Sequence, residues 1–69
     1  MRMYEFYYIA YPRDADLVDI VMIPQIIVSM GQSEHEARRI AILALLERGL
    51  FIKEIEYKDS YDNSANTLS

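Results

Sequence analysis

The only histidine of the chain, His35, lies between Glu34 and Glu36 and is the first candidate for acid–base chemistry. A general base of this kind needs a partner within hydrogen-bonding distance. Adjacent residues on a helix point apart, so this spacing does not place His35 against either glutamate. Arg38 follows Glu34 by four residues, which favours an ion pair along the helix over an anion site. We therefore interpret His35 as a solvated residue of a first helical turn.

Other patterns that support catalysis or metal binding are missing from the sequence. It contains no cysteine, and a single histidine cannot form a multi-histidine metal centre within one chain. There is no Gly-rich phosphate loop and no serine nucleophile motif. We therefore predict no catalytic residues, no metal and no cofactor, and we expect that the protein is not an enzyme.

The acidic residues are grouped. The chain has 11 acidic and 7 basic residues and a formal net charge of -4, which disfavours direct binding to nucleic acid. Alternate residues of a strand share a face at roughly 6.6–7 Å, close to the phosphate spacing of one nucleic-acid strand. The alternative is that these carboxylates serve solubility alone. The candidate binding site for a basic partner consists of Asp14, Asp16, Asp19, Glu54, Glu56, Asp59 and Asp62.

The first segment, Arg2–Tyr11, is rich in aromatic and β-favouring residues and predicts a strand. Both of its faces are apolar or aromatic, which is typical of a central strand or of one whose second face meets a partner. Its tyrosines could stack on nucleic-acid bases, but only Arg2 and Arg13 supply positive charge nearby. Core packing together with a protein interface is the better interpretation.

The second segment is harder to interpret. Residues 12–16 have the composition of a turn. The β-branched residues that follow predict an extended run over 17–23, a corner at Pro24 and Gln25, and a strand over 26–30 that Gly31 closes. A short helix over 15–22 is the alternative, because Asp14 or Asp16 could cap it.

The third segment predicts a helix from Glu34 to Arg48. Ser33 is a suitable N-cap, and Glu36 stands three residues later, which is the capping-box arrangement. Arg48 complements the negative end of the helix dipole, and Gly49 supplies a left-handed stop.

This helix has more apolar surface than one small core requires. We expect its core face to consist of Ala37, Ile40, Ala41, Ala44 and Leu45. A second apolar patch then remains, which a homodimer would cover, by pairing of helices or by joining of sheets at an edge of the first or last strand. The alternatives are a cover from residues 12–25 or from the tail, or plain exposure. The predicted dimer interface is Ile42, Leu43, Leu46, Tyr7 and Tyr11.

The last apolar segment, residues 50–58, predicts a strand with Phe51, Ile55 and Tyr57 on one face and a polar outer face. Residues 59–69 lack apolar periodicity and are expected to form a flexible tail. The predicted fold class is α+β, with order β-β-α-β and one helix on a three-stranded mixed sheet. The strands before and after the helix would lie parallel, with the first strand antiparallel alongside. Residues 1–58 would form one domain.

In size, acidity, lack of cysteine and element order, residues 1–58 resemble the small host-takeover proteins of bacteriophages. Some members of that group are homodimeric DNA mimics that occupy the DNA-binding surface of basic host proteins such as the nucleoid protein HU. The resemblance implies an inhibitor that acts in the host cytoplasm. The alternative is an antitoxin-like or scaffold module that binds through its apolar helix face and strand edges. The apolar run over 20–31 is too short to span a membrane, so we expect a cytoplasmic protein.

Overall fold

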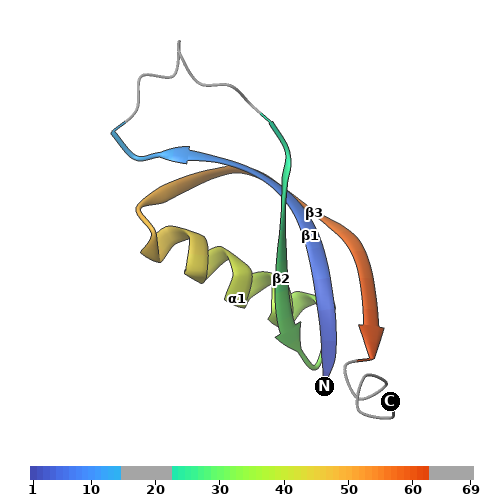
Figure 1. The fold of residues 1–69 in the computed structure, drawn as a ribbon. Coiled ribbons are helices and arrows are strands. Elements are labelled where there is room, and N and C mark those ends of the chain that lie inside the picture. The colour runs from blue at the N-terminus through green and yellow to red at the C-terminus, as the bar shows by residue number, and fades with distance from the viewer. Residues whose placement is uncertain (15–22, 63–69) are drawn as a thin grey trace, which may run out of the picture.

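The computed structural model describes residues 1–14 and 23–62. Within them the chain forms β1 (Arg2–Pro12), β2 (Gln25–Gly31), α1 (Glu34–Glu47) and β3 (Leu50–Asp62). The three strands make one antiparallel sheet in the order β2-β1-β3, and α1 packs on one face of it (Figure 1). We call the face that carries the helix the inner face, and the opposite face the outer face. The predicted extended run and its short-helix alternative fall largely outside the described residues.

The sheet is antiparallel, so the prediction of a mixed sheet was wrong. β1 lies between the other two strands, and Phe6 is paired with Ile27 on one side and Tyr57 on the other. The helix carries the chain across β1 to the far edge, so β2 and β3 run in the same direction without being neighbours. A long aromatic strand gains cross-strand contacts on both sides, which favours the central place. β1 is therefore the central strand, which is one of the two interpretations that its sequence allowed, although the expected parallel pairing of the second and last strands would have placed it at an edge. β2 pairs only with residues 2–8 of β1, so residues 9–12 have no strand partner on that side within the described chain.

β3 contains two irregularities that change which side chains share a face. The pairing with β1 shifts between Glu5 and Phe6 and again between Ile9 and Ala10, which leaves Lys58 and Lys53 as extra residues. Each extra residue of a β-bulge offsets the strict alternation of side chains.

The second bulge places Phe51 on the opposite face of the sheet from the one predicted. Phe51 is paired with Tyr11 on the outer face, whereas Ile55 and Tyr57 face the helix. The prediction that these three side chains share a face was therefore wrong for Phe51. The strand also continues to Asp62, so residues 59–62 belong to the sheet and not to a tail, and residues 63–69 lie outside the described part of the chain.

The helix begins as its sequence predicts. The Ser33 hydroxyl accepts a hydrogen bond from the Glu36 amide at 3.2 Å. The Glu36 carboxylate accepts from the backbone amide of Gln32 at 3.4 Å, one residue before the expected position. The helix ends at Glu47, with Arg48 as C-cap and Gly49 at a φ of 79°, so the stop is confirmed and Arg48 lies just beyond the last turn.

The core consists of a few side chains between α1 and the inner face. Ile27 and Ile55 pack at its margin. Ile40, which the sequence placed in the core, is 47% exposed, while Arg38 and Ile42 are half-buried. The helix is thus turned toward Arg38, whose guanidinium lies 5.6 Å above the ring of the fully buried Phe6. The buried apolar residues are Tyr4, Phe6, Ala37, Ala41 and Leu45.

Gly31 is the point where β2 and α1 approach most closely. A Cβ at this position would lie 2.8 Å from the backbone nitrogen of Ala37. The sequence suggested only that Gly31 closes the second segment, whereas the structure shows that it makes room for the first turn of the helix. Its φ is not positive, since Gly49 is the one positive-φ glycine in the described ranges.

Candidate protein-binding face

The outer face of the sheet carries apolar and aromatic side chains from all three strands. The register places every second residue of β1 on this face, with Tyr7 between Ile26 of β2 and Glu56 of β3. No helix or strand of residues 1–14 and 23–62 covers it. Six of its large side chains are between 39% and 52% exposed: Tyr7, Ile26, Val28, Met30, Phe51 and Tyr61. Met3, Ile9 and Tyr11 lie half-buried among them.

Three contacts hold aromatic rings of this face in place. The rings of Tyr11 and Phe51 meet edge to face at a centroid distance of 5.9 Å, and the guanidinium of Arg13 lies 5.5 Å from the Phe51 centroid. The Lys58 ammonium lies 5.8 Å from the Tyr7 centroid. Such ring and cation contacts restrict the orientation of the side chains on this face.

Lys58 also forms an ion pair with Glu5 at 3.1 Å across the bulge. The hydrogen bond from Lys58 to this carboxylate, and then the charge of the carboxylate, raise the pKa of the Lys58 ammonium. One of the carboxylates of the outer face is therefore already neutralised within the chain.

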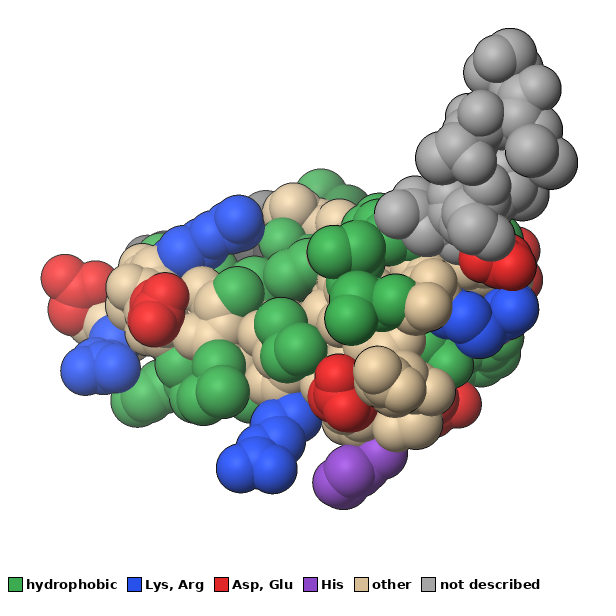
Figure 2. All heavy atoms as spheres, turned by 90° about the horizontal axis from the view of Figure 1, so that it is seen from below, with side chains coloured by type: hydrophobic (Ala, Val, Ile, Leu, Met, Phe, Trp, Pro, Cys, Tyr) green, Lys and Arg blue, Asp and Glu red, His purple; other side chains and the backbone are tan. Residues whose placement is uncertain are grey.

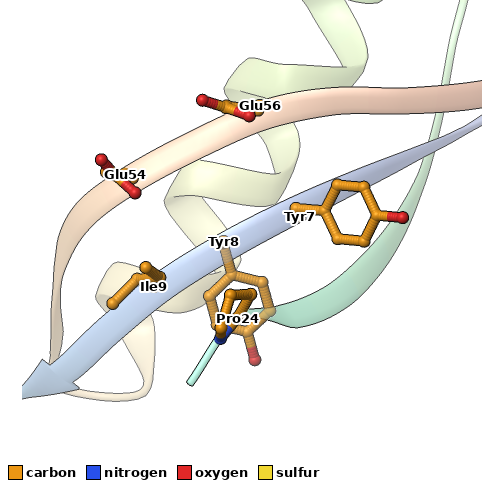
Figure 3. A pocket seen from close by; sticks show the side chains of 6 residues that line it. All are labelled: Tyr7, Tyr8, Ile9, Pro24, Glu54 and Glu56. Carbon is orange, nitrogen blue, oxygen red and sulfur yellow. The ribbon is translucent and has the colours of Figure 1, made fainter. Parts of the chain in front are cut away.

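A pocket of about 280 Å³ opens beside Tyr7, in the direction away from Glu5. Glu54 and Glu56 extend from β3 along one of its walls, and Tyr7 and Ile9 come from the adjacent stretch of β1 (Figure 3). Tyr8 and Pro24 complete the lining where β2 begins. Neither glutamate has an ion-pair partner in the described part of the chain.

The structure brings three of the predicted acidic residues onto one face and separates the others. Glu54, Glu56 and Asp59 are paired with outer-face residues of β1 and follow one another along β3. Asp14 lies just beyond the far end of β1, and Asp62 is paired with Arg2 at its start. A strand of 11 residues spans roughly 35 Å, so these two cannot share a compact site. Asp16 and Asp19 lie outside the described residues.

Charge is also dispersed on the side of the molecule seen from below. In Figure 2, acidic side chains are spread over both ends and the middle of the molecule, among Lys or Arg side chains and hydrophobic side chains. No strongly acidic patch covers this view. The carboxylates that the fold does align are those of β3.

The five residues of the predicted dimer interface do not form one surface. Leu43 and Leu46 are 54% and 38% exposed on α1, next to the half-buried Ile42. Tyr7 and Tyr11 lie on the outer face, on the other side of the sheet. Ile42 and Leu43, but not Leu46, border a separate hollow of about 210 Å³, whose other lining residues are His35, Arg38 and Arg39.

The residues around His35 have the arrangement expected for a solvated helix start. His35 is exposed, and Arg38 forms an ion pair with Glu34 at 2.9 Å. Over residues 1–14 and 23–62, no group of three or more His, Asp or Glu side chains is placed to hold a metal ion. In the same ranges, no helix has the length and apolar content needed to cross a membrane.

Sequence reasoning missed the contribution of β2 and of the pocket to this face. The outer-face residues of β2 alternate with its inner-face residues, and they are Ile26, Val28 and Met30. This two-residue period could have identified them from the sequence. The outward position of Phe51 had no such signal, because it depends on a bulge. Comparison of the chain with protein families, with curated proteins and with solved structures finds no match.

Proposed function

We propose that this protein is a non-catalytic binding module that attaches to a basic protein through the outer face of its sheet. The observation that carries the proposal is an apolar face that no helix or strand of the described chain covers, bordered by a row of carboxylates on β3. The proposed partner is a nucleic-acid-binding protein, whose basic surface the carboxylate row would occupy in place of a nucleic-acid strand.

The apolar part of the face supports binding to a protein rather than to a small polar ligand. Contiguous apolar patches on small soluble proteins mark interaction sites. Tyrosine, phenylalanine and methionine are enriched in the centre of protein interfaces, because they gain contact area at low entropic cost. All three residue types are exposed here, in Tyr7, Phe51 and Met30.

The charged part of the face supports a basic partner. Glu54 and Glu56 share a face at alternate positions, about 6.6–7 Å apart along the strand, and Asp59 follows beyond the bulge at Lys58. This spacing resembles that of successive phosphates in a nucleic-acid strand. Carboxylates at the rim of an interface accelerate association with a positive surface and make it sensitive to salt.

The proposal is tested by measuring binding to the nucleoid protein HU, the basic DNA-binding protein that the resemblance indicates. Isothermal titration at about 50 mM and about 300 mM salt should show affinity that falls as screening increases. Glu56→Lys should weaken binding by at least about fivefold, because it reverses a rim charge. Glu47→Lys is the matched control, since it makes the same charge change at an exposed position on α1.

Competition with duplex DNA completes this test. If the protein occupies the DNA-binding surface, it should displace labelled DNA from HU in proportion to its occupancy. Absence of binding at low salt, or equal effects of Glu56→Lys and Glu47→Lys, would contradict the proposal.

A second candidate function is self-association through α1. Leu43 is 54% exposed and Leu46 is 38% exposed, with Ile42 beside them, which leaves an apolar strip on the solvent side of the helix. A second copy of the chain would pair this strip with itself about a two-fold axis. Light scattering after size exclusion should then show a dimer that Leu43→Glu converts to a monomer. A wild-type monomer at high concentration would remove this candidate.

A further inference from the structure

We infer that the pocket beside Tyr7, which residues of β1 and β3 and Pro24 line, binds a single ammonium or guanidinium group. A lysine or arginine side chain of the partner would supply this group. The pocket is lined by Tyr7, Tyr8, Ile9, Pro24, Glu54 and Glu56. This inference rests on the proposed function and makes it specific, because it names the chemical group that anchors the basic partner.

The size of the pocket suits one side chain. Its volume of about 280 Å³ lies just below the range of roughly 300–1,000 Å³ that holds drug-sized ligands. Tyr8, Ile9 and Pro24 offer apolar walls, against which the aliphatic part of a lysine or arginine can pack. The charged end of such a side chain would then lie near the glutamates.

The charge of the pocket selects a cation. Glu54 and Glu56 are paired with Ile9 and Tyr7, neutral residues that provide no counter-charge. The described chain gives neither glutamate an ion pair, although the exposed Lys53 is adjacent to Glu54 in sequence. Two carboxylates on the same face repel each other, and a cation between them relieves that repulsion.

The ring of Tyr7 provides an internal precedent for this binding. The ammonium of Lys58 already lies 5.8 Å from its centroid, which is the arrangement of a cation–π contact. Lys58 forms its ion pair with Glu5, two positions before Tyr7 in β1. The pocket lies on the other side of Tyr7, toward Ile9, and Lys58 is not part of its lining.

The test is a titration of the full chain with small cations, followed residue by residue by NMR. The probes are butylammonium and butylguanidinium, and the controls are the neutral butanol and the anionic butyrate. We expect saturable shifts at the amides of Tyr7, Ile9, Glu54 and Glu56 with the cations only. The spectrum of each variant also reports whether that variant is folded.

Two substitutions in the pocket and one outside it sharpen the result. Glu56→Gln removes one carboxylate and should weaken butylammonium binding by about three- to fivefold. Tyr7→Leu keeps an apolar wall and removes the aromatic ring, so it should weaken binding by about two- to fivefold. Glu47→Gln makes the same charge change on α1 and should leave the affinity unchanged.

The outcomes separate this inference from the proposed function. If the cations give no saturable shifts, or if butanol gives the same shifts, the inference is wrong, and salt-sensitive binding to HU would still support the proposed function. If the cations bind in the pocket and HU does not bind, the pocket assignment stands and the proposed function fails. Equal effects of Glu56→Gln and Glu47→Gln would also overturn the inference.

Discussion

Replacement of Gly31 by alanine is expected to destabilise the protein by about 1–2 kcal/mol. The added Cβ would lie 2.8 Å from the Ala37 nitrogen, whereas ordinary contact begins at 3.4 Å, so the backbones must separate by about 0.6 Å (3.4 - 2.8). The obstructing atom belongs to the backbone, so no side-chain rotation relieves the clash. The same nitrogen donates a hydrogen bond to the Ser33 carbonyl at 3.0 Å, and the shift would strain that bond.

Two opposing terms set this magnitude. Overpacking of a well-packed contact costs about 1–3 kcal/mol. Alanine also lowers the conformational entropy of the unfolded chain. This raises the free energy of unfolding by about 0.4–1 kcal/mol where the native backbone conformation suits alanine. For a domain of this size, 1 kcal/mol corresponds to about 4–8 °C in melting temperature. We therefore expect the midpoint of thermal unfolding to fall by about 5–15 °C, measured by circular dichroism together with urea unfolding.

Gly49 supplies the matched control, because the backbone conformation requires glycine there, whereas lack of space requires it at position 31. A Cβ there would meet nothing within 4 Å, but its φ is 79°, so alanine at this position costs about 1–2 kcal/mol of backbone strain. Asparagine tolerates that conformation and should recover part of the loss at position 49. At position 31, asparagine should be worse than alanine, because the obstacle is space.

A second substitution tests the mechanism directly. Ala37→Gly in the Gly31→Ala background removes one methyl group but leaves the Ala37 nitrogen and Cα in place. We therefore expect no rescue. Full stability in Gly31→Ala, or restored stability in the double variant, would refute the close-approach explanation.

Three further predictions concern the core, the helix cap and the outer face. Leu45 is fully buried, so Leu45→Ala should cost about 2–5 kcal/mol in urea unfolding, whereas Leu43→Ala, at a side chain 54% exposed, should change stability by less than about 0.5 kcal/mol. Ser33→Ala removes the acceptor for the Glu36 amide and should cost about 0.5–2 kcal/mol, with partial recovery in Ser33→Asp. The hydrogen bond to Glu5 raises the pKa of Lys58 in the folded state. The stabilisation that the Lys58–Glu5 ion pair gives the fold is therefore complete below the ordinary lysine pKa of about 10.4, and it is lost as pH rises through the raised pKa. The stability difference between wild type and Lys58→Met should therefore shrink as pH rises above about 10.4, in urea titrations at successive pH values; a difference that stays constant would show that the ion pair contributes nothing.

The candidate site was only partly predictable. Alternation along a strand identified Tyr7, Glu54 and Glu56 as surface side chains, and the fold places them on one face. The association of Glu54 and Glu56 with Tyr7 in a pocket depends on pairing between residues more than 40 positions apart in the sequence, which no local pattern specifies. The predicted dimer surface combined helix and strand residues that the sheet separates. For this reason, Tyr7 cannot support a helix-mediated interface.

The sequence by itself located the helix and the strands of the described chain, although it ended the last strand at residue 58 and the structure continues that strand to Asp62. The Ser33 cap and the Glu36 capping contact act within the first turn of the helix, and the left-handed Gly49 acts at its end. Each signal is local, so the helix could be located without its surroundings. The dense aromatic character of Arg2–Tyr11 identified a strand for the same reason, whereas its central place was only one of two interpretations.

Only the tertiary structure decided how these elements combine. The antiparallel order β2-β1-β3, the bulges at Lys53 and Lys58, and the rotation of α1 that exposes Ile40 all depend on contacts between distant segments. A bulge offsets the faces of a whole strand, and helix rotation follows the volume of the rings beneath it. These choices create the outer face and its pocket, because they turn Phe51 outward and align Glu54 and Glu56 beside Tyr7.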